Sequence, residues 1–262
     1  MMKTKIFYFF VATLMLTACD NIEESERLIY EAPPTANRAV LIEDFTGQQC
    51  VNCPTAADTI HSLQQRYGDS VVIAVAIHGG AMSVKPNPAK PKVVGLATDL
   101  GDSYHNHWKV ETWPMGMVSR GNVSRFAEWE AQVREEIQKK APVNLSATFT
   151  DKDGKVTVET TYMGAIGHTD AKLQVWVVED SITAIQKMPD GSYNSQYIHR
   201  HVFRGAVNGD WGTDISIDEG EKKTDKFDVT LDDTWNRKQL SAVVFVYNDQ
   251  GVLQVISKPL KQ

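Results

Sequence analysis

The sequence is poor in cysteine, in long apolar runs and in positive charge. Only three cysteines occur in 262 residues, so no network of disulfides can hold the chain and its domains must rely on apolar cores. No uninterrupted apolar stretch reaches the roughly 20 residues that a membrane-spanning helix needs. Lysine and arginine total 27 against 33 acidic residues, for a net charge of −6. This balance argues against a nucleic-acid partner, which calls for a basic surface.

The first 18 residues are predicted to be a targeting signal rather than part of the fold. Lys3 and Lys5 precede a short apolar run, and residues 16–18 (Leu-Thr-Ala) then lead to Cys19. A basic start, a short apolar run and small residues before a cleavage point are typical of a signal peptide. The ending resembles the lipobox, after which bacterial lipoproteins are cleaved and acylated on the cysteine. That resemblance implies membrane attachment through a lipid on Cys19; the alternative is plain secretion, with Cys19 lost or idle.

Beyond the signal the chain is expected to form a tether and two domains. Residues 19–36 are acidic, weakly apolar and contain a Pro-Pro pair near their end, so they cannot bury enough surface to fold. The rest is long enough for two modest domains. We place these at residues 37–141 and 142–262, because the hydrophobic pattern changes from helical spacing to alternation at Pro142.

The first domain is predicted to begin with a strand–helix–strand unit. Residues 39–45 are an apolar run of strand length, and a turn then leads to residues 50–54 (Cys-Val-Asn-Cys-Pro). From the second cysteine onward, apolar residues recur with helical spacing until Gly68, and the proline suits the first helical turn. Residues 71–77 are a second apolar strand. The unit is therefore a parallel crossover, with both cysteines where the strand gives way to the helix.

This position of the cysteines favours redox chemistry. Unpaired N–H groups and the positive end of the helix dipole stabilise a thiolate there, so we expect a lowered pKa for the Cys50 thiol. A thiolate at Cys50 can attack a disulfide of a partner protein, and Cys53 can then resolve the mixed disulfide. The same spacing also suits a metal site or an inert disulfide, and both alternatives stay open.

A later segment strengthens the case, because the whole arrangement resembles the thioredoxin family. Residues 108–114 end in Trp113-Pro114, and a short strand, a turn at residues 119–122 and a helix over residues 126–137 follow. Thioredoxins have a cis proline at this place, facing the redox cysteines. The resemblance therefore implies a cis Pro114 and a backbone near Trp113 that pairs with a substrate chain. An ordinary trans turn proline is the alternative.

The resemblance also implies an acid–base residue. Asp44 stands where thioredoxins carry a buried acid that assists proton transfer, and burial there would raise its pKa towards that of a general base. An exposed carboxylate is the alternative, and Glu43 competes for the role. Gln49 replaces a thioredoxin tryptophan at the substrate surface, and the inner Val-Asn dipeptide is also unusual. Since that dipeptide helps set the reduction potential, the direction of the reaction is left open.

The histidines of the first domain are weak candidates for a metal site. His78, His105 and His107 could join the cysteines in binding copper or zinc, as in copper-delivering relatives of thioredoxin, which have one more residue between the cysteines. Solvent-exposed histidines are commoner than ligands, so we expect neither a metal nor another cofactor. Residues 85–92 are predicted to be an irregular basic loop, and residues 93–100 a short helix.

The second domain is predicted to be an all-β, immunoglobulin-like antiparallel sandwich. A hairpin turn falls at residues 151–154, and about seven short strands with turn signals and no helix suit such a sandwich. No catalytic constellation is visible, so a spacer or a partner-binding surface is expected. His199 and His201 alternate along an expected strand at 197–207 and are interpreted as cross-strand packing. Residues 208–212 (Asn-Gly-Asp-Trp-Gly) are a turn with one aromatic that could contact a partner.

The whole pattern resembles the Omp28-related outer-membrane lipoproteins of the Bacteroides group. The resembling features are the lipobox, residues 43–47 leading into the Cys-Val-Asn-Cys-Pro segment, Trp113-Pro114, and the all-β second half. The resemblance implies a location in the outer membrane of the cell envelope, facing the periplasm or the surface, and a role as an adhesin or receptor. A fold alone does not fix a function.

Two functions are therefore predicted. In the first, the chain is a membrane-anchored, extracytoplasmic thiol–disulfide oxidoreductase that acts on a protein thiol or disulfide. Its catalytic residues would be Cys50, Cys53, Pro114 and Asp44, with Trp113 and Gln49 binding the substrate. In the second, the chain is a surface-exposed binding lipoprotein that uses a thioredoxin fold as a scaffold, and the disulfide is structural.

Overall fold

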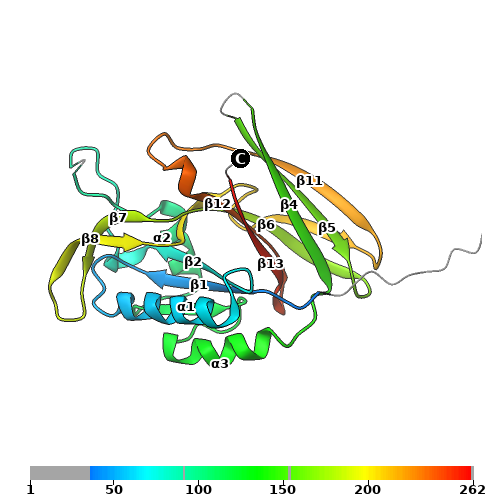
Figure 1. Ribbon diagram of the computed structural model, residues 1–262, viewed down its shortest axis with the longest axis horizontal. Coiled ribbons are helices and arrows are strands. Elements are labelled where there is room, and N and C mark those ends of the chain that lie inside the picture. The colour runs from blue at the N-terminus through cyan, green and yellow to red at the C-terminus, as the bar shows by residue number, and fades with distance from the viewer. Residues whose placement is uncertain (1–35, 91, 153–154, 261–262) are drawn as a thin grey trace, which may run out of the picture. The chain divides into compact units, whose positions relative to one another are not determined.

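The computed structural model describes residues 36–90, 92–152 and 155–260 (Figure 1). The predicted signal peptide at 1–18 and the predicted lipid site at Cys19 lie outside the described residues, as does the predicted tether at 19–36 except for its last residue. Within the described ranges, no helix is both long and apolar enough to cross a membrane.

The predicted strand–helix–strand unit is present. β1 (Val40–Thr46) and β2 (Val72–His78) pair in parallel along their whole length, and α1 (Cys53–Tyr67) connects them. Both strands are buried almost throughout, which explains why their sequences are nearly continuous apolar runs. α1 has Pro54 in its first turn and ends at Gly68, whose φ of 94° lies in the region that favours glycine.

Two more helices cover the two faces of this part of the sheet. β3 (Met115–Val118) pairs antiparallel with β1. α3 (Phe126–Glu136) packs beside α1 on one face, around the buried Trp129. α2 (Asp99–His107) packs on the other face (Figure 1). The cysteine segment therefore begins at the end of a central strand and leads into a helix that is held against the sheet.

The helix predicted at residues 93–100 is wrong. Residues 93–98 have no helical structure, and α2 begins only at Asp99. The hydroxyl of Thr98 accepts a hydrogen bond from the Gly101 N–H at 2.9 Å and so caps the helix. Val93 and Val94 are instead exposed on an irregular segment. Thr98, a residue type that favours the N-cap, is the sequence signal for the true start of this helix.

The described second half of the chain consists mainly of strands, as predicted, but it has ten where about seven were expected, and it contains one short 3-10 helix, η3 (Arg237–Gln239). β4 and β5 form the predicted hairpin around residues 152–155. The strands are β4 (Val143–Lys152), β5 (Lys155–Gly164), β6 (Thr169–Glu179), β7 (Ile182–Lys187), β8 (Tyr193–His199), β9 (Val202–Ala206), β10 (Thr213–Ile217), β11 (Lys222–Val229), β12 (Leu240–Asn248) and β13 (Gly251–Pro259). The strand expected at 197–207 is interrupted between β8 and β9, because His201 adopts a φ of 54°.

One eight-stranded sheet joins the two halves. Its order is β13-β12-β6-β9-β2-β1-β3, with β10 paired to β6. β9 lies parallel to β2 through Ala76 and Val202, and antiparallel to β6. The segments predicted as separate domains, 37–141 and 142–262, thus supply strands to the same sheet. The division of the chain into two domains at residue 141 therefore stays a prediction.

Three large clusters of apolar side chains, and a small fourth one around Leu96, form the core of the described residues. The three-stranded antiparallel sheet β11-β5-β4 packs over the part of the large sheet made by β6, β12 and β13, with Tyr162 and Leu173 in between. A second cluster, with Trp176 and Phe203 at its centre, lies under α2. The third lies under α1 and α3. The fold is therefore mixed α/β with a large antiparallel β-rich part.

Candidate functional site

The two cysteines form a disulfide at the start of α1. Cys50 and Cys53 are bonded to each other, and their Cα atoms are 5.5 Å apart. Cys53 is the first residue of the helix, and Asn52 occupies the N-cap without a side-chain hydrogen bond. No acidic residue lies in the first turn, so nothing there offsets the positive end of the helix dipole. A thiolate formed by reduction of this bond would be stabilised by this helix end.

A shallow groove opens on the Cys50 side of the disulfide. Its volume is about 410 Å³, and its lining includes Gln49, Cys50 and Trp113. The Trp113–Pro114 peptide bond is cis, as the thioredoxin resemblance implied. Trp113 is held in place because its ring stacks on His105, with centroids 6.0 Å apart. The structure thus brings both predicted substrate-binding side chains to the same groove as the predicted attacking cysteine.

Asp44 and Glu43 lie on opposite faces of β1, because neighbouring residues of a strand alternate. Asp44 faces the cysteine side and lines a second cavity together with Cys53. Glu43 faces the α2 side, where its carboxylate pairs with the Arg120 guanidinium at 3.4 Å. Of the two acids weighed from the sequence, only Asp44 lines a cavity together with Cys53.

The Asp44 carboxyl is buried without the hydrogen bonds that would offset its loss of hydration. Its side chain is 2% exposed, and Oδ1 has no hydrogen-bond partner among the described residues. Burial raises the pKa of Asp44 to about 8. The pKa of Glu43 is also raised by burial, while Arg120 pulls it back down in part. Asp44 is therefore protonated at neutral pH, with a pKa that suits a group that takes up and releases a proton.

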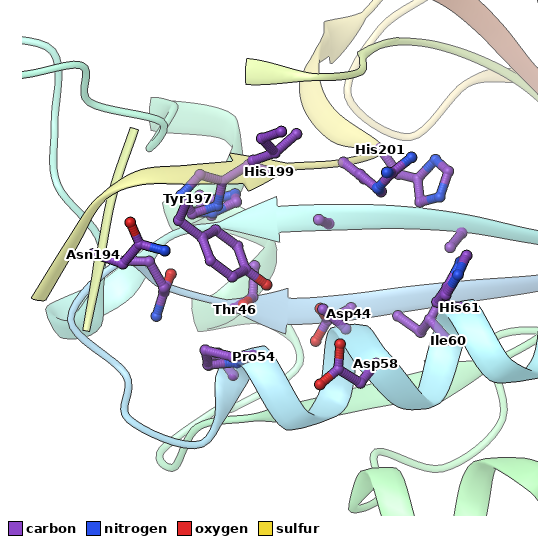
Figure 2. Close-up of a pocket in the computed structure, with 18 of the residues that line it drawn as sticks. Asp44, Thr46, Pro54, Asp58, Ile60, His61, Asn194, Tyr197, His199 and His201 are labelled. Carbon is purple, nitrogen blue, oxygen red and sulfur yellow. The ribbon is translucent and has the colours of Figure 1, made fainter. Parts of the chain in front are cut away.

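The cavity behind Cys53 has a volume of about 410 Å³. Figure 2 shows Pro54 and Asp58 of α1 along one side and Tyr197 of β8 along the other, with the Asp44 carboxylate between them. The tyrosine comes from the second half of the chain, so both halves build this cavity. Cys50 thus lines a surface groove, and Cys53 lines a second cavity that contains the Asp44 carboxyl and opens to solvent at Asp58.

The hairpin β7–β8 covers the cysteine segment, which the sequence did not indicate. Gln186 Nε2 donates to the carbonyl oxygen of Cys50 at 2.9 Å, and the Lys187 N–H donates to the carbonyl oxygen of Gln48 at 2.8 Å. The Tyr193 hydroxyl reaches Gln49 Oε1 at 2.9 Å. These contacts join residues more than 130 positions apart in the chain, so no local pattern announces them.

Of the three predicted metal candidates, His78 lines the same cavity as Cys53, whereas His105 and His107 do not. His78 and His105 are each 2% exposed, against the expectation of solvent-exposed histidines, and burial lowers the pKa of both. Nδ1 of His105 lies 2.9 Å from the Gly101 carbonyl oxygen. His107 instead packs against Trp211, with ring centroids 4.3 Å apart. Among the described residues, no group of three or more His, Cys, Asp or Glu side chains could hold a metal ion.

His199 is part of the cavity rather than of a strand surface. It is 5% exposed, and its ring meets that of His78 edge to face at a centroid distance of 5.4 Å. Burial lowers the pKa of His199 to about 4, so both rings are neutral at pH 7. His201, which also lines the cavity, lies beyond the end of β8. The expectation that the two histidines alternate along one strand is therefore wrong.

Comparison with known proteins adds a family and a fold. The family model for outer membrane protein Omp28 matches residues 101–262. No curated protein matches the sequence. Among solved structures, the chain is similar to HBP35 of Porphyromonas gingivalis, with 16% identity and a TM-score of 0.67 over 87% of this chain and 77% of that one. A domain of the outer membrane lipoprotein Omp28 from Porphyromonas gingivalis matches at 23% identity and a TM-score of 0.33, covering 46% of this chain and 89% of that domain.

Proposed function

The chain belongs to the Omp28 family of outer membrane proteins, and from this premise we propose that it is a membrane-anchored thiol–disulfide oxidoreductase of the cell envelope. Cys50 is the attacking cysteine and Cys53 the resolving one. Residues 37–141 supply a thioredoxin-like unit, and residues 142–262 an immunoglobulin-like sandwich that shares its sheet. The anchor is a lipid on Cys19. A buried, unpaired Asp44 carboxyl beside the Cys50–Cys53 disulfide is the observation that carries this proposal.

The proposed exchange moves two electrons and two protons between two pairs of sulfurs. In the reducing direction the Cys50 thiolate attacks one sulfur of the partner's disulfide, which forms a mixed disulfide and releases the partner's other sulfur as a thiolate. The Cys53 thiol then gives its proton to the Asp44 carboxylate, which is the minor form at pH 7 and the main form above pH 8, and attacks Cys50 Sγ. The Cys50–Cys53 bond forms and the partner's second sulfur leaves as a thiolate. The partner's two thiolates then take up one proton from Asp44 and one from water, which replaces the proton that Cys50 had lost to water on ionising. The reverse sequence oxidises a partner dithiol.

Asp44 suits this step because of where it is buried. A thiol in apolar surroundings loses its proton reluctantly, and a carboxyl with a pKa of about 8 is close to an unperturbed thiol in proton affinity. Proton transfer between two such groups has a small energetic cost in either direction. The same residue can therefore take the proton from Cys53 when the disulfide forms and return it when the disulfide is reduced.

The surroundings of the groove favour a protein substrate over a small thiol. Five of the six exposed large apolar side chains of the described residues lie on segments near the disulfide. Three of these segments hydrogen-bond directly to Gln48 or Gln49, the residues before Cys50. An apolar rim of this kind is typical of protein-binding surfaces. The five residues are Met82, Val93, Val94, Tyr193 and Ile198.

The test is disulfide exchange by the full mature chain, followed as reduction of insulin by dithiothreitol. We expect activity in the native chain, its loss in Cys50→Ser, and a trapped mixed disulfide in Cys53→Ser that non-reducing gels detect. Asp44→Asn should keep the disulfide but slow resolution and flatten the pH dependence of the rate. Asp58→Asn, on the exposed side of the same cavity, is the matched control. Activity that survives in Cys50→Ser would contradict the proposal.

A second function, a binding scaffold with a structural disulfide, is favoured by one observation. Cys50 is only 4% exposed and Cys53 only 3%, and the β7–β8 hairpin is bonded to the segment that carries them. The reduction potential separates the two functions. Structural disulfides have potentials below about −300 mV, whereas catalytic pairs lie between roughly −120 and −270 mV. A value in the lower range, together with an inactive native chain, would establish the scaffold.

A further inference from the structure

A larger hollow lies on the α2 side of the sheet. Glu43 faces this side, whereas Asp44 faces the opposite one. The volume of the hollow is about 970 Å³, more than twice that of either cavity beside the disulfide. Three aromatic side chains from distant segments line it: Trp108 after α2, Trp211 before β10, and Tyr247 of β12. The turn at 208–212, which the sequence marked as a contact point, supplies one of these walls.

The walls of the hollow are held rigidly. The Tyr247 hydroxyl donates to the carbonyl oxygen of Trp211 at 2.7 Å, and the Tyr104 hydroxyl donates to that of Asp210. The buried side chain of Asn208 bonds to two backbone groups of β6, at 2.7 and 2.8 Å. A loop fixed at so many points presents Trp211 in one orientation, so a ligand need not pay to order it.

The base of the hollow is a buried cation with an unused donor. The side chain of Arg120 is 3% exposed, and its guanidinium lies 4.0 Å from the centroid of the Tyr247 ring. Glu43 pairs with it only at 3.4 Å, and Nη1 has no hydrogen-bond partner among the described residues. An unsatisfied buried donor is unfavourable, and a ligand oxygen would satisfy it. The Arg120 guanidinium also repels a positively charged ligand from the Tyr247 ring, which it covers.

The rim is polar and slightly acidic. The lining carries three aspartates, among them Asp214 and Asp249, against the two cations Lys172 and Arg120. Lys172 is moreover paired with Asp214 at 2.6 Å. The rim thus offers no unpaired cation to an anionic ligand, while its carboxylates accept hydrogen bonds from hydroxyl groups. Both charged classes of ligand are disfavoured, and an uncharged one with many hydroxyls is favoured.

We propose that this hollow binds a neutral oligosaccharide. A sugar ring has one face of C–H groups and a periphery of hydroxyls. Because the indole rings of Trp211 and Trp108 are inclined at 69° to each other, each offers its face to a different sugar ring of the oligosaccharide. The hydroxyls donate to Asp214 and Asp249, and a sugar oxygen accepts from Arg120. Fixed aromatic surface combined with a few placed polar groups is how proteins select such a ligand. The site is independent of the disulfide and of the function proposed for it.

The test is binding of the full mature chain to an array of neutral and anionic oligosaccharides, followed by calorimetric titration with the neutral glycan that gives the strongest signal. We expect saturable binding of at least one neutral glycan. Trp211→Ala should weaken it at least about tenfold, as truncation of a central aromatic contact does. Asp214→Ala, an exposed rim position that leaves the core intact, should weaken it several-fold.

The matched control is Tyr193→Ala, which removes an exposed aromatic at the disulfide side of the molecule. It should bind like the native chain, which excludes non-specific stacking on any exposed ring. The proposal is overturned if no neutral glycan binds, if only anionic glycans bind, or if both Trp211→Ala and Asp214→Ala bind with native affinity.

Discussion

Replacing Asp44 by asparagine should stabilise the oxidised protein, and increasingly so as the pH rises. The carboxyl is 2% exposed, and its pKa rises from 3.8 to about 8 on folding. Between these two values the folded chain binds a proton that the unfolded chain has released, so the free energy of unfolding falls as the pH rises. Asparagine fills nearly the same volume and cannot ionise, so it removes this loss.

The magnitude follows from the two pKa values. Stability should fall by about 1.4 kcal/mol for each pH unit between the two, which amounts to about 4 kcal/mol at pH 7 and about 6 kcal/mol above pH 8. These are upper values, because the amide of the variant must itself be accommodated in the cavity. At pH 5 the variant should gain only about 1.5 kcal/mol.

Urea denaturation of both oxidised proteins from pH 5 to pH 9 measures this difference directly. Titration of Glu43, His78 and His199 is common to both proteins and cancels when their stabilities are subtracted. The difference should widen with pH and level off above pH 8. Asp58→Asn, an exposed position of the same cavity, should show no such widening. A difference between Asp44→Asn and the native chain that is constant across the whole range would refute the assignment of a raised pKa to Asp44.

Two further predictions concern the other face of the sheet. Arg120→Met leaves Glu43 buried without its cation and should cost about 3–5 kcal/mol by urea denaturation, whereas adding Glu43→Gln should restore much of it; equal losses in the single and double variants would argue against the pair. Gly212→Ala should cost more than Gly167→Ala. Both glycines have positive φ, but a Cβ at Gly212 would lie 2.3 Å from the Leu173 carbonyl oxygen, while one at Gly167 meets nothing within 4 Å. Thermal melts of the two variants give the comparison, and similar melting temperatures would contradict it.

Local patterns were enough to predict the strand–helix–strand unit that carries the cysteines. β1 and β2 are buried on both faces and therefore almost wholly apolar, and α1 carries a proline at its start and a glycine just beyond its end. The resemblance to thioredoxins added the cis bond before Pro114 and the buried position of Asp44. The choice between Asp44 and Glu43 required the structure, because both neighbours of a buried strand are covered.

The remaining features depend on contacts between distant segments. β8 exposes most of its side chains, so its sequence shows nothing of the hairpin that it forms over the cysteine segment. The pairing of β9 with β2 rests on Ala76 and Val202, two small apolar residues that would suit many other partners. The aromatic side chains of the hollow on the α2 side come from Trp108, Trp211 and Tyr247. The sequence marked only Trp211 as a possible contact point, and nothing in it indicated that the other two would join it. Such sites become visible only when the chain is folded.

The hairpin over the disulfide also sets an order of events in biosynthesis. Because the chain is synthesised from its N-terminus, Cys50 and Cys53 appear about 130 residues before Ile182, the first residue of β7. Until then Gln186 and Lys187 cannot bond to the cysteine segment, and both sulfurs are open to enzymes and small oxidants. The nascent chain is thus a better disulfide-exchange substrate than the finished protein. The pair is therefore most open to oxidation before residues 182–199, which form the hairpin, fold over it.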